Sequence, residues 1–495
     1  MTHCATTAAG EVQGREKNGA LLFAGIPYAA PPVGPRRFRP PEPYDGWRSV
    51  RDATRFGPAA PQLPGEGLTS TPNVSWDEDC LTLNVCTPAL DDGRRPVLVW
   101  IHGGAFRTGQ GGIPWYSGIS FARGDVVTVS LNYRLGALGF AHLPELGGAD
   151  FASSGTNGVL DQIAALEWVR ENIAAFGGDP GKVTVAGESA GGMSVGVLLG
   201  CPAASGLFRA AIPQSGAAHH VLGAPEGEEV ARRWAKELRA DDLETLQARP
   251  VSEILEAQVR VEEECAREGD ANGVGGMPFR PVVDGHVLPT PPLDAIASGC
   301  SADTAVLIGT NLDETTLFGM PDLDEAALAR LAERYLGRGS EAVATYRASR
   351  PEANPRDLAF AITTDHMFRI PAVRLAEAHA DAGGRVWMYL FSWRSRAFGG
   401  ALGATHALEI PFAWNNLDKP GVAALLGEGE TPQALADRMH AAWTAFAHGA
   451  DPNCEALPAW EPYGTERRDV MELGDRVGPL ADPAAAERAL WEGIR

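Results

Sequence analysis

The chain has 495 residues, of which 44% are hydrophobic and 21% are charged, so it can bury a large core. Its 42 basic and 63 acidic side chains give a formal net charge of −21, which repels phosphate backbones and anionic membrane surfaces. We therefore expect neither a nucleic-acid partner nor membrane association.

The sequence indicates neither export nor a membrane anchor. Residues 1–12 are polar and small, and no stretch approaches the ~18 consecutive apolar residues of a membrane span. The seven cysteines are an odd number without a CxxC pair, which favours reduced thiols. We expect a cytoplasmic protein that is a monomer or a weak homo-oligomer.

Apolar, β-branched runs bounded by Gly and Pro alternate with segments in which apolar residues return every three or four positions. The predicted strands are 96–101, 126–131, 183–186, 210–213, 305–308 and 386–391, and the predicted helices are 158–176, 190–199, 371–382 and 432–448. This alternation predicts a mainly parallel sheet with helices on both faces. Two charged, helix-favouring stretches, 224–271 and 322–357, are predicted to be helical insertions within one domain spanning 1–495.

The first chemical signal follows the predicted strand 96–101, where the chain reads His102-Gly-Gly-Ala-Phe106. It is similar to the HGG loop of lipases and esterases, in which small residues let backbone N–H groups approach a developing oxyanion. Gly104 and Ala105 are the candidate donors from this loop, with Ala190 as a third. Read by itself, the loop could also be a simple turn at the end of a strand.

The second signal is Gly187-Glu-Ser-Ala-Gly191, between the predicted strand 183–186 and the predicted helix 190–199. A strand, a GxSxG turn and a helix form a nucleophile elbow, which lifts the serine hydroxyl clear of the backbone. The helix that follows points its positive end at the developing charge. Ser189 is therefore the candidate nucleophile, and the alternative is a glycine-rich turn with an idle serine.

The partners of a serine nucleophile are expected downstream, in the order Ser, acid, His. The segment after the predicted strand 305–308 offers two adjacent acids, Asp313 and Glu314, and spacing alone does not choose between them. Among the downstream histidines, His406 lies on a predicted loop after the strand 386–391. It can reach the carboxyl edge of the sheet, so it is the candidate base.

At this point the sequence resembles the type-B carboxylesterase family, which includes bacterial para-nitrobenzyl esterases and cholinesterases. The resemblance spans nearly the whole chain and includes the segment around His406. Its other motifs are FAGIPYA (23–29), RFRPPEP (37–43), EDCLTLN (78–84), WIHGGAF (100–106), NYRLG (132–136), GGDP (177–180), GESAGG (187–192) and GTNLDE (309–314).

The resemblance implies an α/β-hydrolase fold and identifies Glu314 as the acid. It also implies two buried ion pairs, of Arg37 with Glu78 and of Arg134 with Asp161, and a supporting role for Ser215 behind the triad. Two positions depart from the family pattern. Thr315 stands where Gly is usual, and Cys80 lacks the upstream partner cysteine of exported relatives, which agrees with a reduced protein.

The expected activity is hydrolysis of small to medium uncharged esters by Ser189, His406 and Glu314 through an acyl-enzyme, without metal or organic cofactor. The same machinery could cleave carbamates or amides, and a non-catalytic binding protein is a weaker alternative. Five apolar residues are candidates for the substrate pocket, with ordinary core packing as the alternative for each: Phe106, Trp115, Met193, Phe318 and Met320.

Overall fold

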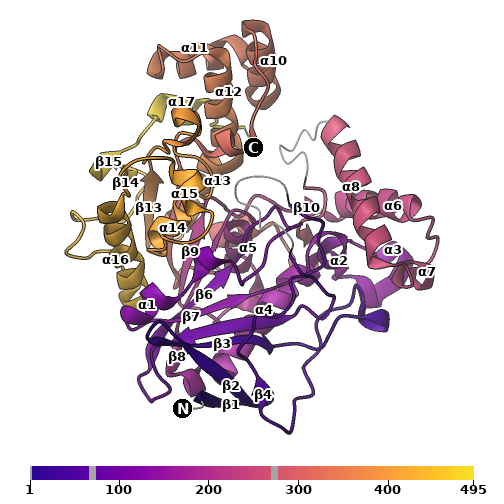
Figure 1. Ribbon diagram of the computed structural model, residues 1–495. Helices are drawn as coiled ribbons and strands as arrows, with labels where there is room; N and C mark the ends of the chain where they lie inside the picture. Colours follow the sequence, from indigo (N-terminus) through magenta and orange to yellow (C-terminus); the bar gives the residue numbers. More distant parts are fainter. Residues whose placement is uncertain (1–2, 66–73, 269–276, 495) are drawn as a thin grey trace.

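The computed structural model describes residues 3–65, 74–268 and 277–494. One large sheet runs through the molecule in the order β1-β2-β3-β5-β7-β6-β8-β9-β12-β13-β14-β15 (Figure 1). These strands are β1 (His3–Thr7), β2 (Gly10–Lys17), β3 (Ala20–Pro27), β5 (Thr82–Thr87), β6 (Arg95–Ile101), β7 (Val127–Leu131), β8 (Gly178–Glu188), β9 (Ala210–Gln214), β12 (Ala305–Asn311), β13 (Val386–Phe391), β14 (Asp469–Leu473) and β15 (Val477–Ala481). Short strands complete the set: β4 (Arg51–Asp52), which pairs with β2, and β10 (Leu222–Gly223), which pairs with β11 (Val282–Val283).

The seven central strands, from β7 to β14, are parallel, and antiparallel strands extend the sheet at both ends. All six predicted strands lie in this parallel part. Most of its strands contain apolar runs, as expected of a parallel sheet that helices cover on both faces. The α/β-hydrolase fold predicted from the sequence is confirmed.

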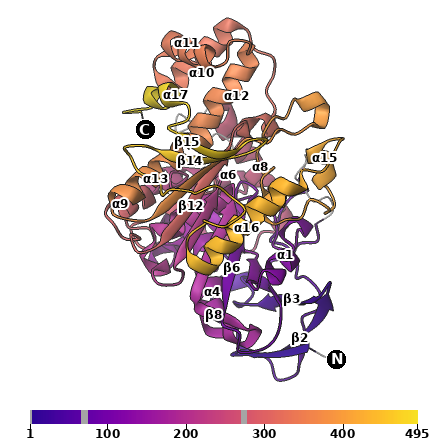
Figure 2. The ribbon, with the colours of Figure 1, turned by 90° about the vertical axis from the view of Figure 1, so that its left-hand side faces the viewer.

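Two layers of helices sandwich the parallel strands. The core on one face includes residues of α4 (Asn157–Asn172), α5 (Ala190–Leu199) and α13 (Ile370–Asp381). The core on the other face includes residues of α1 (Ile119–Arg123), α14 (Ile410–Ala413) and α16 (Gln433–Gly449), and Figure 2 shows α16 lying over the strands. Shorter helices elsewhere in the fold are α2 (Gly136–Phe140), α3 (Pro144–Gly147), α9 (Pro292–Ala297), α15 (Val422–Leu426) and α17 (Ala485–Leu490).

The two stretches predicted as insertions are helical where the structure describes them; residues 269–271 of the first lie outside the described residues. The first holds α6 (Ala224–Glu237), α7 (Leu243–Gln247) and α8 (Val251–Glu268), and the second holds α10 (Glu325–Leu336), α11 (Gly339–Ser349) and the start of α12 (Pro355–Thr364). The helices α10–α12 form a small core of their own. Leu490, the last residue of α17, and Trp491, which follows it, pack into this core. In Figure 1 the two groups stand apart at the top and the right of the molecule.

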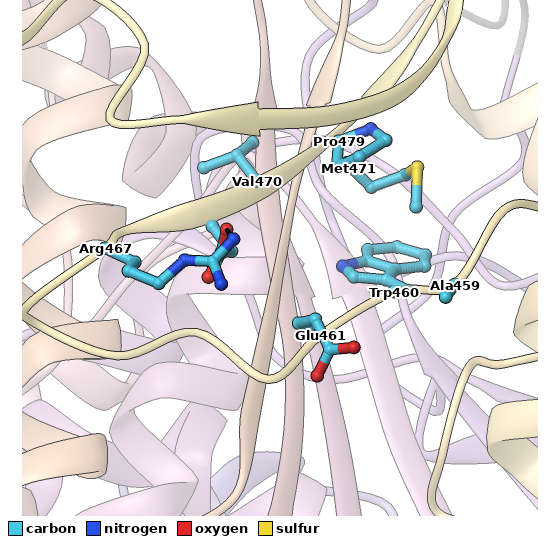
Figure 3. Close-up of a pocket in the computed structure, with 8 residues that line it drawn as sticks. Ala459, Trp460, Glu461, Arg467, Val470, Met471 and Pro479 are labelled. Atoms are coloured by element: carbon cyan, nitrogen blue, oxygen red, sulfur yellow. Dashed lines mark hydrogen bonds and ion pairs between the residues drawn. The ribbon is translucent and has the colours of Figure 1, made fainter.

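The far edge of the sheet carries a hollow of about 290 Å³ beside β14 and β15. Figure 3 shows Trp460 and Met471 on one side of this hollow and the Arg467 side chain on the other. Arg467 forms an ion pair with Asp469 at 3.0 Å, so its charge is compensated there. None of the residues predicted to act in catalysis lines this hollow.

Candidate active site

The loops that carry the predicted site residues begin at the carboxyl ends of parallel strands. Ile101, the last residue of β6, pairs with Gly187 of β8, and Asn311, the last residue of β12, pairs with Phe391 of β13. The four loops therefore start at one edge of the sheet. Residues far apart in the sequence meet there, as is usual in open α/β sheets.

Ser189 sits between β8 and α5 in a strained conformation, with φ 56° and ψ −125°. Its N–H donates to the Gln214 carbonyl at 3.0 Å, which ties the turn to β9. A Cβ at Gly191 would lie 2.0 Å from the Ile101 carbonyl oxygen, so only glycine fits this position. The strain and the close approach are those of a nucleophile elbow.

His406 and Glu314 are in direct contact. The imidazole Nδ1 lies 2.6 Å from Glu314 Oε2, and the other carboxylate oxygen accepts the Asn311 N–H at 2.8 Å. The His406 N–H also donates to the Glu314 carbonyl, at 3.2 Å. A carboxylate on Nδ1 fixes the tautomer that leaves Nε2 able to accept a proton.

Asp313, the competing acid, is turned away from the imidazole. Its Oδ2 accepts the Ala404 N–H at 2.9 Å and lies 3.5 Å from Arg394. Asp313 therefore holds the loop that precedes His406. The structure brings Glu314 to the histidine, in agreement with the choice that the family resemblance made.

The Ser189 hydroxyl does not hydrogen-bond to His406 in this structure. His406 Nε2 instead lies 3.2 Å from Glu188 Oε1, on the residue just before the serine. A hydrogen bond between a catalytic serine and its histidine often forms or tightens only when substrate is bound, so the lack of this bond here does not exclude Ser189 as the nucleophile. It does show that a carboxyl group competes for the nitrogen that would take the serine proton.

A third glutamate completes a cluster of buried acids around His406. Glu409 accepts hydrogen bonds from Gln214 Nε2 at 3.0 Å and from Asn311 Nδ2 at 2.6 Å. Sequence reasoning missed Glu188 and Glu409 as functional groups. Their positions carried a signal, because Glu188 lies inside the elbow motif and Glu409 follows the base by three residues.

The pKa values of the groups in this cluster depart strongly from their ordinary values, because burial and the neighbouring charges both act on them. Burial raises the pKa of Glu188 to about 8 and that of Glu409 to about 7. Burial lowers the pKa of His406, but the carboxylates of Glu188 and Glu314 outweigh it and raise the value to about 9. The arrangement therefore stabilises an imidazolium, the charge that a general base acquires in acyl transfer.

The predicted oxyanion loop has the backbone that close approach requires. Gly104 has φ 115°, and a Cβ there would lie 2.2 Å from the Thr108 carbonyl oxygen. Among the described residues, none accepts a hydrogen bond from the N–H groups of Gly104, Ala105 or Ala190. The three predicted donors are thus available to an oxygen of a ligand.

His102, at the start of this loop, keeps it in place. Burial lowers its pKa to about 4, so the ring is neutral, and its Nδ1–H donates to the Gly103 carbonyl at 2.8 Å. The ring also stacks on Tyr133, with 4.6 Å between the centroids. His102 therefore supports the loop and is not a second base.

Of the five candidate pocket residues, Phe318 lies next to the imidazole. Its ring is 57% exposed, and its centroid is 5.3 Å from that of His406. Phe368, which sequence reasoning missed, also packs against the imidazole, with 4.7 Å between the two ring centroids. It lies on a π-helical turn, Asp365–Arg369, which no sequence period indicates.

The other four candidates pack against core clusters, and a pocket role for them stays a prediction. Phe106 and Met193 are completely buried, and Phe106 packs edge-on against Phe140 in the core under the sheet. Trp115 is buried in the core of the opposite face and donates to the Pro420 carbonyl. Met320 packs against the core of α10–α12. Apolar residues near a catalytic motif are more often core than pocket, because the motif itself is built on the core.

The supporting residues that the resemblance implied are in place. Arg134 and Asp161 are buried and 2.7 Å apart, and Arg37 and Glu78 form a bidentate pair at 2.6 Å. Ser215 is buried at the end of β9, and its hydroxyl has no hydrogen-bond partner in the described part of the chain.

Thr315, the departure from the family pattern, has a structural role. Its hydroxyl donates to the Phe360 carbonyl at 3.0 Å and lies 2.8 Å from the Thr363 hydroxyl. The side chain therefore fastens the loop of Glu314 to α12.

Within the ranges that the structure describes, no group of three or more His, Cys, Asp or Glu side chains is placed to hold a metal ion. None of the helices in these ranges has both the length and the apolar composition that crossing a membrane requires.

Comparisons with known proteins place the chain in a family. The model of the carboxylesterase family matches residues 2–489. The para-nitrobenzyl esterase of Bacillus subtilis (strain 168) is 39% identical over 99% of this chain and 98% of that protein. The phenmedipham hydrolase of Pseudarthrobacter oxydans is 36% identical over 96% of both chains.

Solved structures agree with the sequence comparisons. The crystal structure of the Geobacillus stearothermophilus carboxylesterase EST55 at pH 6.2 superposes with a TM-score of 0.88, at 41% identity and 99% coverage of both chains. The resemblance seen in the sequence motifs is confirmed. The chain belongs to the carboxylesterase family and is a serine carboxylic ester hydrolase.

Proposed function

We propose that this enzyme hydrolyses small to medium uncharged carboxylic esters by two-step acyl transfer. Ser189 attacks the ester carbonyl while His406 Nε2 takes its proton, and Glu314 stabilises the imidazolium that forms. The N–H groups of Gly104, Ala105 and Ala190 donate to the oxyanion of the tetrahedral intermediate. His406 then gives the proton to the leaving alcohol, and water hydrolyses the acyl-enzyme by the same steps.

The observation that carries the proposal is the buried His406–Glu314 pair, 2.6 Å apart, at the sheet edge where the strained Ser189 turn also lies. A core histidine needs no carboxylate on Nδ1 and no nearby serine in a strained turn. The preference for uncharged esters is supported by the aromatic rings of Phe318 and Phe368 beside the imidazole, which offer apolar contact to a substrate.

The proposal is tested by replacing the nucleophile. We expect Ser189→Ala to lower the turnover of para-nitrophenyl butyrate by ~10⁵-fold or more, with an unchanged thermal midpoint. The matched control is Ser205→Ala, at an exposed serine in the segment between α5 and β9. Retention of more than a few per cent of activity by purified Ser189→Ala would show that another group is the nucleophile.

The substrate class is tested with the wild-type enzyme. Matched neutral and negatively charged esters of one alcohol, and the corresponding carbamate, are compared by kcat/KM. We expect the neutral ester to be the best of the three. A carbamate hydrolysed faster than the ester would assign the same machinery to carbamates.

A further inference from the structure

A cavity of about 340 Å³ lies on the sheet face next to α1, and none of the proposed catalytic residues lines it. Its floor is formed by side chains of β3, β5 and β7, where Leu22 pairs with Cys86 and Cys86 with Thr128. The segment between Gly111 and Ile119 forms one wall, and Lys419 and Pro420 close it from the side of α15. Figure 2 shows α1 between β3 and α15. The volume is at the lower end of the ~300–1,000 Å³ typical of ligand sites.

The floor of this cavity is polar where the neighbouring strand is apolar. On the same face, β6 presents Leu98 and Trp100, whereas their partners on β7 are Thr128 and Ser130. Thr128 is 4% exposed, and its hydroxyl makes no hydrogen bond to any residue that the structure describes. Because Thr128 lines the cavity, its hydroxyl can bond to water or to a ligand that enters.

The wall opposite this floor is held in a fixed position. Ser130 Oγ donates to the Gly111 carbonyl at 2.7 Å, and the Gly111 N–H donates to Asn132 Oδ1 at 2.8 Å. Asn84 Nδ2 donates to Ser130 Oγ at 3.1 Å. The cavity is therefore preformed, which lowers the entropy cost of binding.

Two lysines lie at this cavity. The chain has four lysines, and two of them, Lys17 and Lys419, line it, whereas none of its described lining residues is acidic. Lys419 pairs with the exposed Asp418 at 2.7 Å, but Lys17 has no ion pair in the described part of the chain. Partial burial and the neighbouring cations Arg15 and Lys419 lower the pKa of Lys17. Lys17 is therefore a cation at this cavity whose charge no carboxylate of the described residues compensates, and it can attract an anionic ligand.

We propose that this cavity binds a small monocarboxylate with a compact apolar body, of the benzoate class. Lys17 and Lys419 hold the carboxylate, the body lies against Leu22, Ile113 and Ile119, and the Thr128 hydroxyl supplies a hydrogen bond from the floor. Acids of this class are what hydrolysis of carboxylic esters releases. The ligand is therefore of the same chemical class as the enzyme's own acid product.

The test is benzoate binding measured by isothermal titration calorimetry on the full chain, with benzamide as the neutral isostere. We expect Lys17→Met to weaken benzoate binding at least tenfold and Thr128→Val to weaken it several-fold, while Lys17→Arg keeps most of the affinity. Lys236→Met, on exposed α6, is the matched control and should leave the affinity unchanged. Hydrolysis of para-nitrophenyl butyrate by Lys17→Met should stay within twofold of wild type, so the result is independent of the proposed catalytic roles.

Three outcomes would overturn the proposal. Benzoate binding that survives Lys17→Met intact would place the ligand elsewhere, including at the proposed active site. Benzamide binding as tightly as benzoate would remove the role of the charge. No binding at concentrations up to about 10 mM, beyond the ~1 mM that corresponds to −4.1 kcal/mol, would leave the cavity without this ligand.

Discussion

Two buried charge clusters in this enzyme differ in their balance of charge. At Arg134 and Asp161 one guanidinium faces one carboxylate, 2.7 Å away, with both side chains almost completely buried. Burial lowers the pKa of Arg134, but Asp161 outweighs it, so the pKa stays above its ordinary range. The Arg134 guanidinium therefore stays charged, and the pair, which lies outside the candidate site, holds the structure.

At His406 three buried carboxyl groups surround one imidazole. Glu314 and Glu188 flank its two nitrogens, and Glu409 is tied to the same loop through Asn311. Carboxyl groups outnumber the cation, so protons must be shared within the cluster. The comparison teaches that an unbalanced buried cluster can change its charge during a reaction, whereas a balanced pair is structural.

Among changes within the two clusters, the largest effect is expected from removing the charge that faces His406 Nδ1. Glu314→Gln keeps the shape but not the charge, so we expect turnover to fall by ~10⁴-fold, equivalent to ~5.5 kcal/mol, with little change in thermal midpoint. The measurement is kcat for para-nitrophenyl butyrate, with folding checked by circular dichroism. The matched control is Asp313→Asn, which only weakens the tether to Ala404 and should cost less than about tenfold.

The reverse result would contradict the placement of the loop. If Asp313→Asn were the inactive variant and Glu314→Gln the active one, the acid would have been assigned one residue away from its true position. Thr315, which fastens this loop to α12, would then be the first residue to study.

We expect a substitution in the Arg134–Asp161 pair to lower the stability of the fold and to leave the catalytic mechanism unchanged. Asp161→Asn leaves the Arg134 guanidinium buried without its counter-charge, so we expect a loss of ~3–5 kcal/mol in the free energy of unfolding, measured by urea denaturation. The pH profile of the residual folded enzyme should not move. Asp150→Asn, which breaks the exposed pair with Arg39, is the control and should cost less than ~1 kcal/mol. Equal losses for the two variants would mean that the Arg134 pair is not a buried structural pair.

The sequence predicted the central parallel strands of the sheet better than the antiparallel strands at its ends. Six of the seven parallel strands were predicted to within a few residues, except that β8 starts earlier, because each contains an apolar run. The seventh, β14 (DVMEL), was missed because acidic residues interrupt its apolar run. Among the antiparallel strands, β2 (GEVQGREK) mixes polar and apolar residues and its burial alternates only in part, so its signal is weak. In contrast, β3 (ALLFAGIP) is apolar throughout and was still missed. One-sided burial leaves a weaker signal than two-sided burial.

The candidate site was predictable to the extent that it lies in motifs. Ser189, Glu314 and His406 were each found after a predicted strand, and the structure brings the last two into contact. Glu188 and Glu409 were missed because a carboxyl group in a sequence is usually exposed, and only packing shows that these are buried. Phe106 and Met193 are buried in the core, which proximity to a motif does not show, because it does not tell which way a side chain points.

The last and smallest effect concerns the carboxyl group that faces His406 Nε2. In the wild-type enzyme, the first proton taken up by the cluster as pH falls resides on His406 or on Glu188, 3.2 Å away. On the imidazole it removes the base directly. On Glu188 it places a donor against Nε2 and blocks the same lone pair. The acidic limb of the pH profile therefore follows the pair and not the histidine alone.

Replacing Glu188 with Gln removes this partner, so the imidazolium loses a stabilising charge and the His406 pKa must fall. Because the enzyme needs neutral His406, a lower pKa keeps it active at lower pH. We expect the midpoint of the acidic limb of kcat/KM to move down by about one pH unit, which is ~1.4 kcal/mol. Glu409→Gln is the matched control, since Glu409 hydrogen-bonds to Gln214 and Asn311 and acts on the imidazole from farther away, and its shift should be smaller. A midpoint that stays in place or moves up in Glu188→Gln would show that Glu188 is not charged in the active enzyme and that Glu314 alone raises the His406 pKa.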